Sequence, residues 1–365
     1  MVYLDHASTG PLSSRVREAI AAHLEQRHRT NPNNFEKLIQ IIERGRRRVA
    51  ELLGCSVGRV EYAPNTSSGL NVLALGYPWK KGDRIAVPSC EFPANVQPWL
   101  GLRERHGVIV DFIPAQDGTF SLEDVAQTLL PDTRLVSISW VQFLSGFRCD
   151  LHALAELVHG NNVLLAVDAI QGLGALRLNV EDVGIDFLAC GGQKWLLATQ
   201  GSAFVYVSDS LQDRLLPVRG WQNGPVDWDD FGAFTDTLHP DATRFRTGTL
   251  NSIGCVALDA ALSLYLETGP AEIEQQVLRN ADKLAEGMTE LGFQRFGSQR
   301  PEHSSGIVTF DVPSPKAFLR FLWARNIRAS VRNQKLRFAP HAYNTDREID
   351  TVLEACSEFI HAVSV

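Results

Sequence analysis

The sequence predicts an α/β protein in which a mostly parallel sheet of the seven-stranded type is covered by helices. Two observations predict it. Short, nearly continuous apolar runs of strand length recur through the middle of the chain, and amphipathic segments of helical length separate them. At 365 residues the chain is too long for one typical core, so a second, smaller α+β domain is expected at the C-terminal end.

The apolar runs and periodic segments define the expected elements in order. Strands are expected at 84–88, 108–112, 135–139, 163–167, 203–207 and 306–310. Helices are expected at 14–29, 35–53, 122–130, 151–158, 254–291, 315–325 and 345–363. The resulting domain prediction is an N-terminal segment (1–15) that packs on the small domain, a large domain (16–252) that carries the functional site argued below, and a small C-terminal domain (253–365).

Composition excludes several classes of function. The chain is 44% hydrophobic and 21% charged, as soluble globular proteins are, and its net charge of −7 gives no basis for binding nucleic acid or an anionic membrane. No apolar run approaches the ~20 residues of a membrane span, and the first residues do not resemble a signal peptide. Six scattered cysteines without metal-ligand spacing predict buried, reduced thiols, no metal site and a cytoplasmic location. Four arginines at 44 and 46–48 are interpreted as a solvated helix face rather than a polyanion site.

The residues that carry chemistry are a lysine and an aspartate, each at the end of an apolar run. Asp168 ends the run 163–167, and Lys194 follows the run 185–188 after a glycine-rich turn. Pyridoxal 5'-phosphate (PLP) needs a lysine amine for its Schiff base and an acidic partner for its pyridine nitrogen. The pair, in this order and context, predicts a PLP site.

A phosphate site is expected at the turn that follows residues 60–63. Thr66 and Ser67 open a helix there, where backbone N–H groups, hydroxyls and the positive helix end would face a phosphate. Without Lys194, an ordinary N-cap would explain these residues equally well.

These motifs together resemble the class V aminotransferase superfamily of fold-type I PLP enzymes, which includes cysteine desulfurases, kynureninase and isopenicillin N epimerase. The resemblance runs from the opening Tyr3-Leu4-Asp5-His6-Ala7-Ser8 to the segment 336–345. It implies that Gln171 hydrogen-bonds the phenolic oxygen of the cofactor and that Ala7 lies near the substrate. It also implies that Thr249 reaches the phosphate of the neighbouring subunit in a homodimer, and that Arg337 holds the substrate α-carboxylate.

The departures from the family pattern narrow the reaction. No cysteine lies in 325–335, where desulfurases carry their nucleophile, so a standard desulfurase is not expected. Phe92 replaces a stacking histidine and would stack on the cofactor ring. Gln193 stands where desulfurases often have a histidine and is expected to contact the cofactor, and Gly191 replaces a hydroxyl residue that often binds phosphate. The asparagine that many relatives aim at the cofactor is lost, and Gln142 would substitute for it.

The resemblance and the motifs predict an enzyme that acts on an amino acid through an external aldimine and removal of the Cα proton by Lys194. An aminotransferase is the leading prediction. A C–S (β-elimination) lyase, an epimerase or a non-standard cysteine desulfurase is the alternative. Arg332, a second cation close to Arg337, is expected to bind substrate and to favour a dicarboxylic or otherwise anionic one, unless it is merely exposed on the surface.

Overall fold

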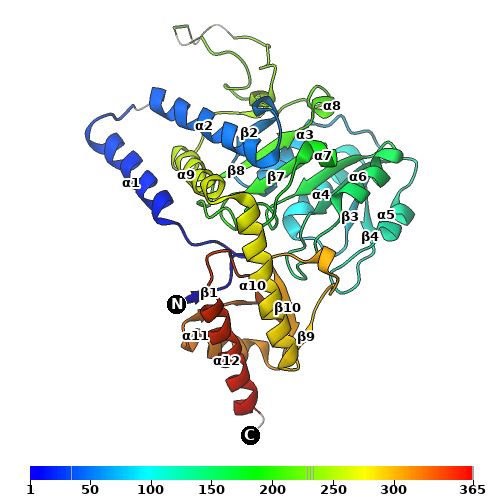
Figure 1. Cartoon of the computed structure of the whole chain (residues 1–365). Coiled ribbons are helices and arrows are strands. Elements are labelled where there is room, and N and C mark those ends of the chain that lie inside the picture. The colour runs from blue at the N-terminus through cyan, green and yellow to red at the C-terminus, as the bar shows by residue number, and fades with distance from the viewer. Residues whose placement is uncertain (34, 228, 231, 233, 364–365) are drawn as a thin grey trace.

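The computed structural model describes residues 1–33, 35–227, 229–230, 232 and 234–363, and it shows one large sheet flanked by helices (Figure 1). Five neighbouring strands of the sheet are parallel, while β8 and β2 at one edge are antiparallel to their neighbours. The predicted fold class is therefore confirmed. In sheet order the strands are β2 (Val60–Ala63), β8 (Ala203–Val207), β7 (Phe187–Gly191), β6 (Leu164–Asp168), β5 (Thr133–Ser139), β3 (Arg84–Pro88) and β4 (Ile109–Ile113).

The central strands β6, β7 and β8 are almost entirely apolar because both faces of the sheet are buried there. Neighbouring residues alternate between two cores: Leu135 and Ala166 belong to one, Val136 and Val167 to the other. The helices of this part of the chain are α1 (Ser14–Arg29), α2 (Phe35–Leu53), α3 (Thr66–Gly76), α4 (Gln97–His106), α5 (Leu122–Thr128), α6 (Leu151–Gly160), α7 (Val180–Val183), α8 (Asp209–Gln212) and α9 (Ser252–Thr268), with short 3-10 turns at Val57–Arg59, Pro93–Asn95 and Ala242–Phe245.

The C-terminal part forms a separate, third core around a four-stranded antiparallel sheet. Its elements are α10 (Pro270–Glu290), β9 (Gln294–Arg295), a 3-10 turn (Pro301–His303), β10 (Val308–Asp311), α11 (Pro315–Ala324), β11 (Ile327–Arg328), β12 (Ser330–Arg332), β13 (Lys335–Phe338) and α12 (Asp346–Val363). The first strand, β1 (Val2–Tyr3), pairs in parallel with β11, so the N-terminus lies beside the C-terminal elements (Figure 1). The exact domain boundaries stay a prediction. The predicted small domain begins at residue 253, yet α9 packs against α1 and α2.

One helix prediction was wrong. The expected helix 254–291 is two helices, because Gly269 has φ 97° and Pro270 starts a new helix. A φ of that sign breaks an α-helix, and proline is favoured at a helix start.

The arginine cluster of α2 was also misinterpreted. Arg46 is buried, with 4% of its surface exposed, and its guanidinium lies 3.1 Å from Asp241 and 3.7 Å from Glu61. Arg44 and Arg48 both pair with Asp259 on α9. The cluster ties α2 to the sheet and to α9 rather than facing solvent throughout.

The thiols match their prediction. All six cysteines are free; four are buried and the other two, Cys55 and Cys90, are partly buried. Among the described helices, none is both long and apolar enough to cross a membrane.

Candidate active site

The sheet topology brings Asp168 and Lys194 to the same edge of the sheet, the one formed by the carboxyl ends of the parallel strands. Asp168 is the last residue of β6, and Lys194 follows the end of the adjacent strand β7. The Asp168 carboxylate is buried and accepts a hydrogen bond from the Ile170 N–H at 3.0 Å. Burial raises the pKa of Asp168 to about 6, against the opposing effect of that hydrogen bond and of Lys194.

Lys194 experiences the opposite effect. Burial lowers the pKa of its amine from 10.5 to about 8, although the charge of Asp168 opposes the decrease. With that pKa, about a tenth of the amine is uncharged at pH 7, far more than for a lysine with its ordinary pKa of 10.5. An uncharged, partly buried amine beside a carboxylate is what a lysine needs in order to act as a nucleophile and as a base.

The phosphate turn lies beside this edge. Asn65 caps α3 by accepting a hydrogen bond from the Ser68 N–H, while the buried hydroxyl of Thr66 has no hydrogen-bond partner. A Cβ added to Gly191 would lie 3.1 Å from Thr66 Oγ1 and 2.5 Å from Gln193 Oε1. Thr66, Gly191 and Gln193 are therefore packed closely at the start of α3 with no room for a side chain at position 191, whereas Ser67 at the same turn is exposed.

Gln171 connects this edge with the N-terminal turn. Its Nε2 donates to the Ala7 carbonyl at 3.0 Å, and its Oε1 accepts from the Trp195 indole at 3.0 Å. One of the two N–H groups of Nε2 is left for another acceptor. Ala7 is buried, and its backbone carbonyl rather than its side chain makes the contact.

The N-terminal turn (residues 5–10) also contacts the loop that holds Lys194 (residues 192–197). The Gly10 N–H donates to the Gln193 carbonyl at 2.8 Å, and the Thr9 hydroxyl donates to the same oxygen at 3.2 Å. A Cβ at Gly10 would come within 2.3 Å of the Lys194 carbonyl oxygen. Only glycine allows the turn to approach the lysine loop this closely.

Arg337 extends into the site from β13, and only 2% of its surface is exposed. Its Nη1 donates to the Phe143 carbonyl at 2.6 Å, and its Nη2 lies 2.8 Å from Ser8 Oγ and 3.3 Å from Asp5 Oδ1. Burial lowers the pKa of Arg337 to about 10; Asp5 opposes that decrease and Arg332 adds to it. The guanidinium is thus fixed by both halves of the protein before any substrate arrives.

An aromatic pair lies over the lysine. The rings of Phe92 and Phe143 meet edge to face at 5.3 Å, and the Lys194 amine lies 5.7 Å from the centre of the Phe92 ring. Phe92 is 44% exposed, so it is not a core residue. Its place beside the lysine supports the interpretation that it covers the cofactor ring.

Glu91 is a site residue that sequence reasoning missed. It is buried, and its carboxylate accepts hydrogen bonds from the Ser139 N–H and hydroxyl, both at 2.5 Å, and from Gln142 Nε2 at 2.8 Å. Burial raises its pKa to about 7, and nearby Asp168 adds to the rise. The amide nitrogen of Gln142 is used by Glu91, so its unpartnered Oε1 is the free atom. A buried glutamate beside the predicted stacking residue was the signal that could have identified it.

Thr249 does not contact these residues within the subunit. It is exposed and lines a groove of about 450 Å3 together with Pro64 and Ser68 of the phosphate turn. Its predicted role needs a second subunit and stays a prediction.

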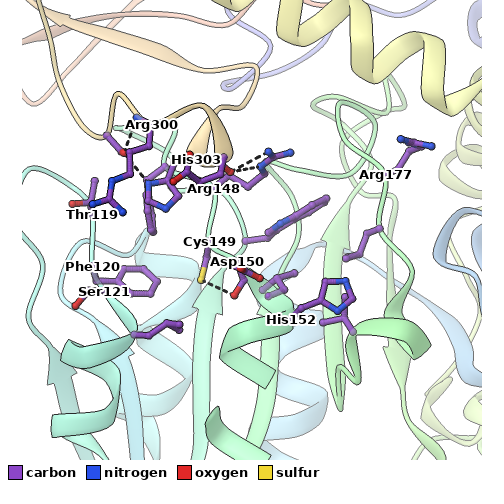
Figure 2. A pocket seen from close by; sticks show the side chains of 18 of the residues that line it. Thr119, Phe120, Ser121, Arg148, Cys149, Asp150, His152, Arg177, Arg300 and His303 are labelled. Atoms are coloured by element: carbon purple, nitrogen blue, oxygen red, sulfur yellow. Dashed lines mark hydrogen bonds between the residues drawn. The ribbon is translucent and has the colours of Figure 1, made fainter. Parts of the chain in front are cut away.

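A second cavity, of about 1540 Å3, lies elsewhere and contains none of the predicted site residues (Figure 2). Arg148, His152, Arg177, Arg300 and His303 project into it, and many of its charges are already paired within the protein. We therefore place the chemistry at the sheet edge around Lys194 rather than in this cavity.

Comparisons with known proteins agree with the fold described above. The family description "Aminotransferase class-V" matches residues 2–331. A probable cysteine desulfurase of Methanothermobacter thermautotrophicus is 28% identical over 85% of this chain and 78% of its own, and the uncharacterized aminotransferase YcbU of Bacillus subtilis is 29% identical over 90% and 86%. The cysteine desulfurase of Thermococcus onnurineus superposes with a TM-score of 0.88 over 99% and 95% of the two chains at 24% identity. The cystine C–S lyase C-DES, in complex with cysteine persulfide, superposes with 0.90 over 97% of both chains at 24% identity.

The fold and the site thus define a PLP-dependent enzyme, a transferase or lyase. The chain belongs to the class V aminotransferase family. The residues present fit the cofactor. The buried, unpartnered Thr66 hydroxyl at the start of α3 suits its phosphate, Asp168 suits its pyridine nitrogen, and the Lys194 amine suits its aldehyde.

Proposed function

We propose that the protein is an aminotransferase that acts on an α-amino acid. The observation that supports the proposal is that the amine of Lys194, whose pKa burial lowers to about 8, lies 5.7 Å from the Phe92 ring, at the position where relatives have a histidine. When bound, PLP takes up the electrons released at the substrate Cα. A single amine that removes the Cα proton and returns it to the cofactor is sufficient for amino transfer.

The other site residues hold the reactants around that amine. Asp168, a buried carboxylate, would keep the cofactor nitrogen protonated, and Gln171 would donate its remaining N–H to the phenolic oxygen. Arg337 would bind the substrate α-carboxylate, because a buried planar guanidinium pairs with a carboxylate in a fixed orientation. Ala7 would line the substrate side through its backbone, and Phe92 would cover the cofactor ring and exclude water.

The thiols do not support a desulfurase that carries sulfur on its own cysteine. Burial raises the pKa of all six cysteine thiols, and the hairpin that holds Arg332 and Arg337 contains none. A thiolate that attacks sulfur has to be exposed and lie in a positive environment. The desulfurase activity named for many relatives therefore does not transfer to this chain unchanged.

A C–S lyase is the second candidate. It is favoured by the names of the similar proteins, which include probable cysteine desulfurases and a cystine C–S lyase. Release of a sulfur group from the β-carbon needs the same base at Cα and no cysteine of the enzyme.

We also propose that the working unit is a homodimer in the cytoplasm. Thr249 is exposed beside the phosphate turn, where a residue of a second subunit would complete the site. Free thiols favour a reducing compartment. If Thr249→Ala binds PLP as tightly as the wild type, the shared site is refuted.

One experiment separates the two reactions. PLP-loaded protein is mixed with a panel of L-amino acids and cysteine conjugates without an amino acceptor, and keto acid and ammonia are measured. An aminotransferase stops after one keto acid per subunit and releases no ammonia. Continuous release of ammonia with a keto acid would refute amino transfer in favour of the lyase, and Lys194→Ala is the inactive control.

A further inference from the structure

The carboxylate-binding end of the site contains an acid that the sequence did not place there. Asp5, in the turn after β1, accepts hydrogen bonds through Oδ1 from the Ser8 hydroxyl at 2.8 Å and from Arg337 Nη2 at 3.3 Å. Ser8 Oγ in turn accepts from Arg337 Nη2 at 2.8 Å and from Arg332 Nη2 at 3.0 Å. One carboxylate and two guanidinium groups therefore converge on a single hydroxyl.

The hairpin geometry explains why both arginines reach this point. Ser330 pairs with Arg337, and Arg332 pairs with Lys335, across β12 and β13. Directly opposed residues point to the same face of an antiparallel pair, so three cations share one face of the hairpin. Lys335 is neutralised by an ion pair with Asp311.

Arg332 differs from its two neighbours. Within the described part of the chain it has no carboxylate partner, and it donates to the Val331 carbonyl and the Ser8 hydroxyl. A guanidinium has five N–H donors, so Arg332 has donors to spare at an exposed position. Arg337, by contrast, already donates to Ser330, Phe143, Ser8 and Asp5.

The net charge of this end of the site follows from its three ionised groups. Two guanidinium groups and the Asp5 carboxylate leave one net positive charge, which a single substrate carboxylate neutralises. A second anion on the substrate would meet Asp5 with no cation left to offset it, and like charges in a partly buried site repel strongly. Asp5 also acts on Lys194, whose pKa it raises, so its charge is felt across the site.

We propose that Asp5 determines substrate specificity by holding the carboxylate subsite at one net positive charge. The site then accepts amino acids whose side chain carries no net negative charge and discriminates against acidic ones. Asp5 neutralises one of the two positive charges of Arg332 and Arg337. The remaining positive charge is balanced by the substrate α-carboxylate, so the two arginines bind one carboxylate rather than two. The inference rests on the proposed function, because it assumes that an α-amino acid binds here, and it reverses the preference for an anionic substrate that Arg332 alone suggests.

The test compares L-asparagine with L-aspartate, which have nearly the same shape and differ in charge. Each is titrated into PLP-loaded protein, and its dissociation constant is taken from the change in the visible absorbance of the cofactor. The wild type should bind L-asparagine more tightly. In Asp5→Asn, which keeps an oxygen for the Ser8 hydroxyl and removes only the charge, the ratio of the two constants should shift toward L-aspartate by about tenfold or more.

Two further variants keep the test decisive if Asp5→Asn folds poorly. Arg332→Gln should weaken both amino acids and shift the ratio the other way, toward L-asparagine. Glu358→Gln removes an acid of α12 whose ion-pair partner is Arg325, outside the cluster, and should leave the ratio unchanged.

A wild type that prefers L-aspartate, or a ratio that neither Asp5→Asn nor Arg332→Gln moves, overturns the role of Asp5. If bound PLP responds to neither amino acid in any variant, the proposed function and this inference both fail.

Discussion

Replacing Lys194 by methionine is expected to stabilise the protein in the absence of cofactor while it abolishes the chemistry. Burial lowers the pKa of this amine from 10.5 to about 8, so the folded chain holds the charged amine less favourably than the unfolded chain does. Methionine fills similar space without a charge. A lysine kept for reaction therefore destabilises the fold that holds it.

The magnitude follows from the pKa difference. A decrease from 10.5 to about 8 corresponds to about 3 kcal/mol at ~1.4 kcal/mol per pH unit. Between pH 8 and 10.5 the unfolded chain binds more protons than the folded chain, so wild-type stability rises with pH across that window. Below pH 8 the whole penalty is present. Lys194→Met should thus exceed the wild type by up to about 3 kcal/mol at pH 7 and by little near pH 10.5.

Urea denaturation of cofactor-free protein, followed by circular dichroism at pH 7 and pH 10, measures both differences. Lys316→Met, at an exposed position of α11, is the matched control and should change stability little at either pH. A Lys194→Met protein that is no more stable than the wild type at pH 7 would refute the reasoning. So would a gain of the same size at both pH values.

Three further predictions concern residues around the site and the core. Thr66→Val should weaken PLP binding about tenfold in an absorbance titration without destabilising the cofactor-free protein, because the Thr66 hydroxyl has no partner until phosphate binds. Arg46→Met should lower the free energy of unfolding by about 3 kcal/mol in urea, because it leaves a buried carboxylate short of a partner, whereas exposed Arg47→Met should have little effect. The Glu91 carboxyl has its pKa raised to about 7, so wild-type stability should fall as the pH rises from 4.5 through 7. Glu91→Gln should flatten that slope in thermal denaturation, and an unchanged slope would contradict the assignment.

Much of the fold could be predicted because its signals are local. The central parallel strands are nearly continuous apolar runs, and the carboxyl ends of neighbouring parallel strands lie side by side, so Asp168 and Lys194 could be paired from the sequence. The break at Gly269 and Pro270 was also readable, since a glycine followed by a proline marks a turn. It was missed because the helical period continues on both sides.

The rest could not be predicted because it depends on contacts between distant segments. Asp5 lies 332 positions from Arg337, and no local pattern shows that they meet. Arg46 looks like a surface residue until Glu61 and Asp241 close around it. Glu91 stands in a recognisable segment, but its burial becomes evident only when Ser139 on β5 is placed beside it.

The position of the N-terminal segment has a consequence for how the enzyme is made. Val2 pairs with Ile327, and Asp5 bridges to Ala339, so these residues have to wait during synthesis for partners that lie more than 300 positions later. At a synthesis rate of roughly 5–20 residues per second, that interval is on the order of tens of seconds. The large sheet can form meanwhile, but the carboxylate subsite cannot. The part of the site that recognises the substrate is therefore the last to be assembled on a nascent chain.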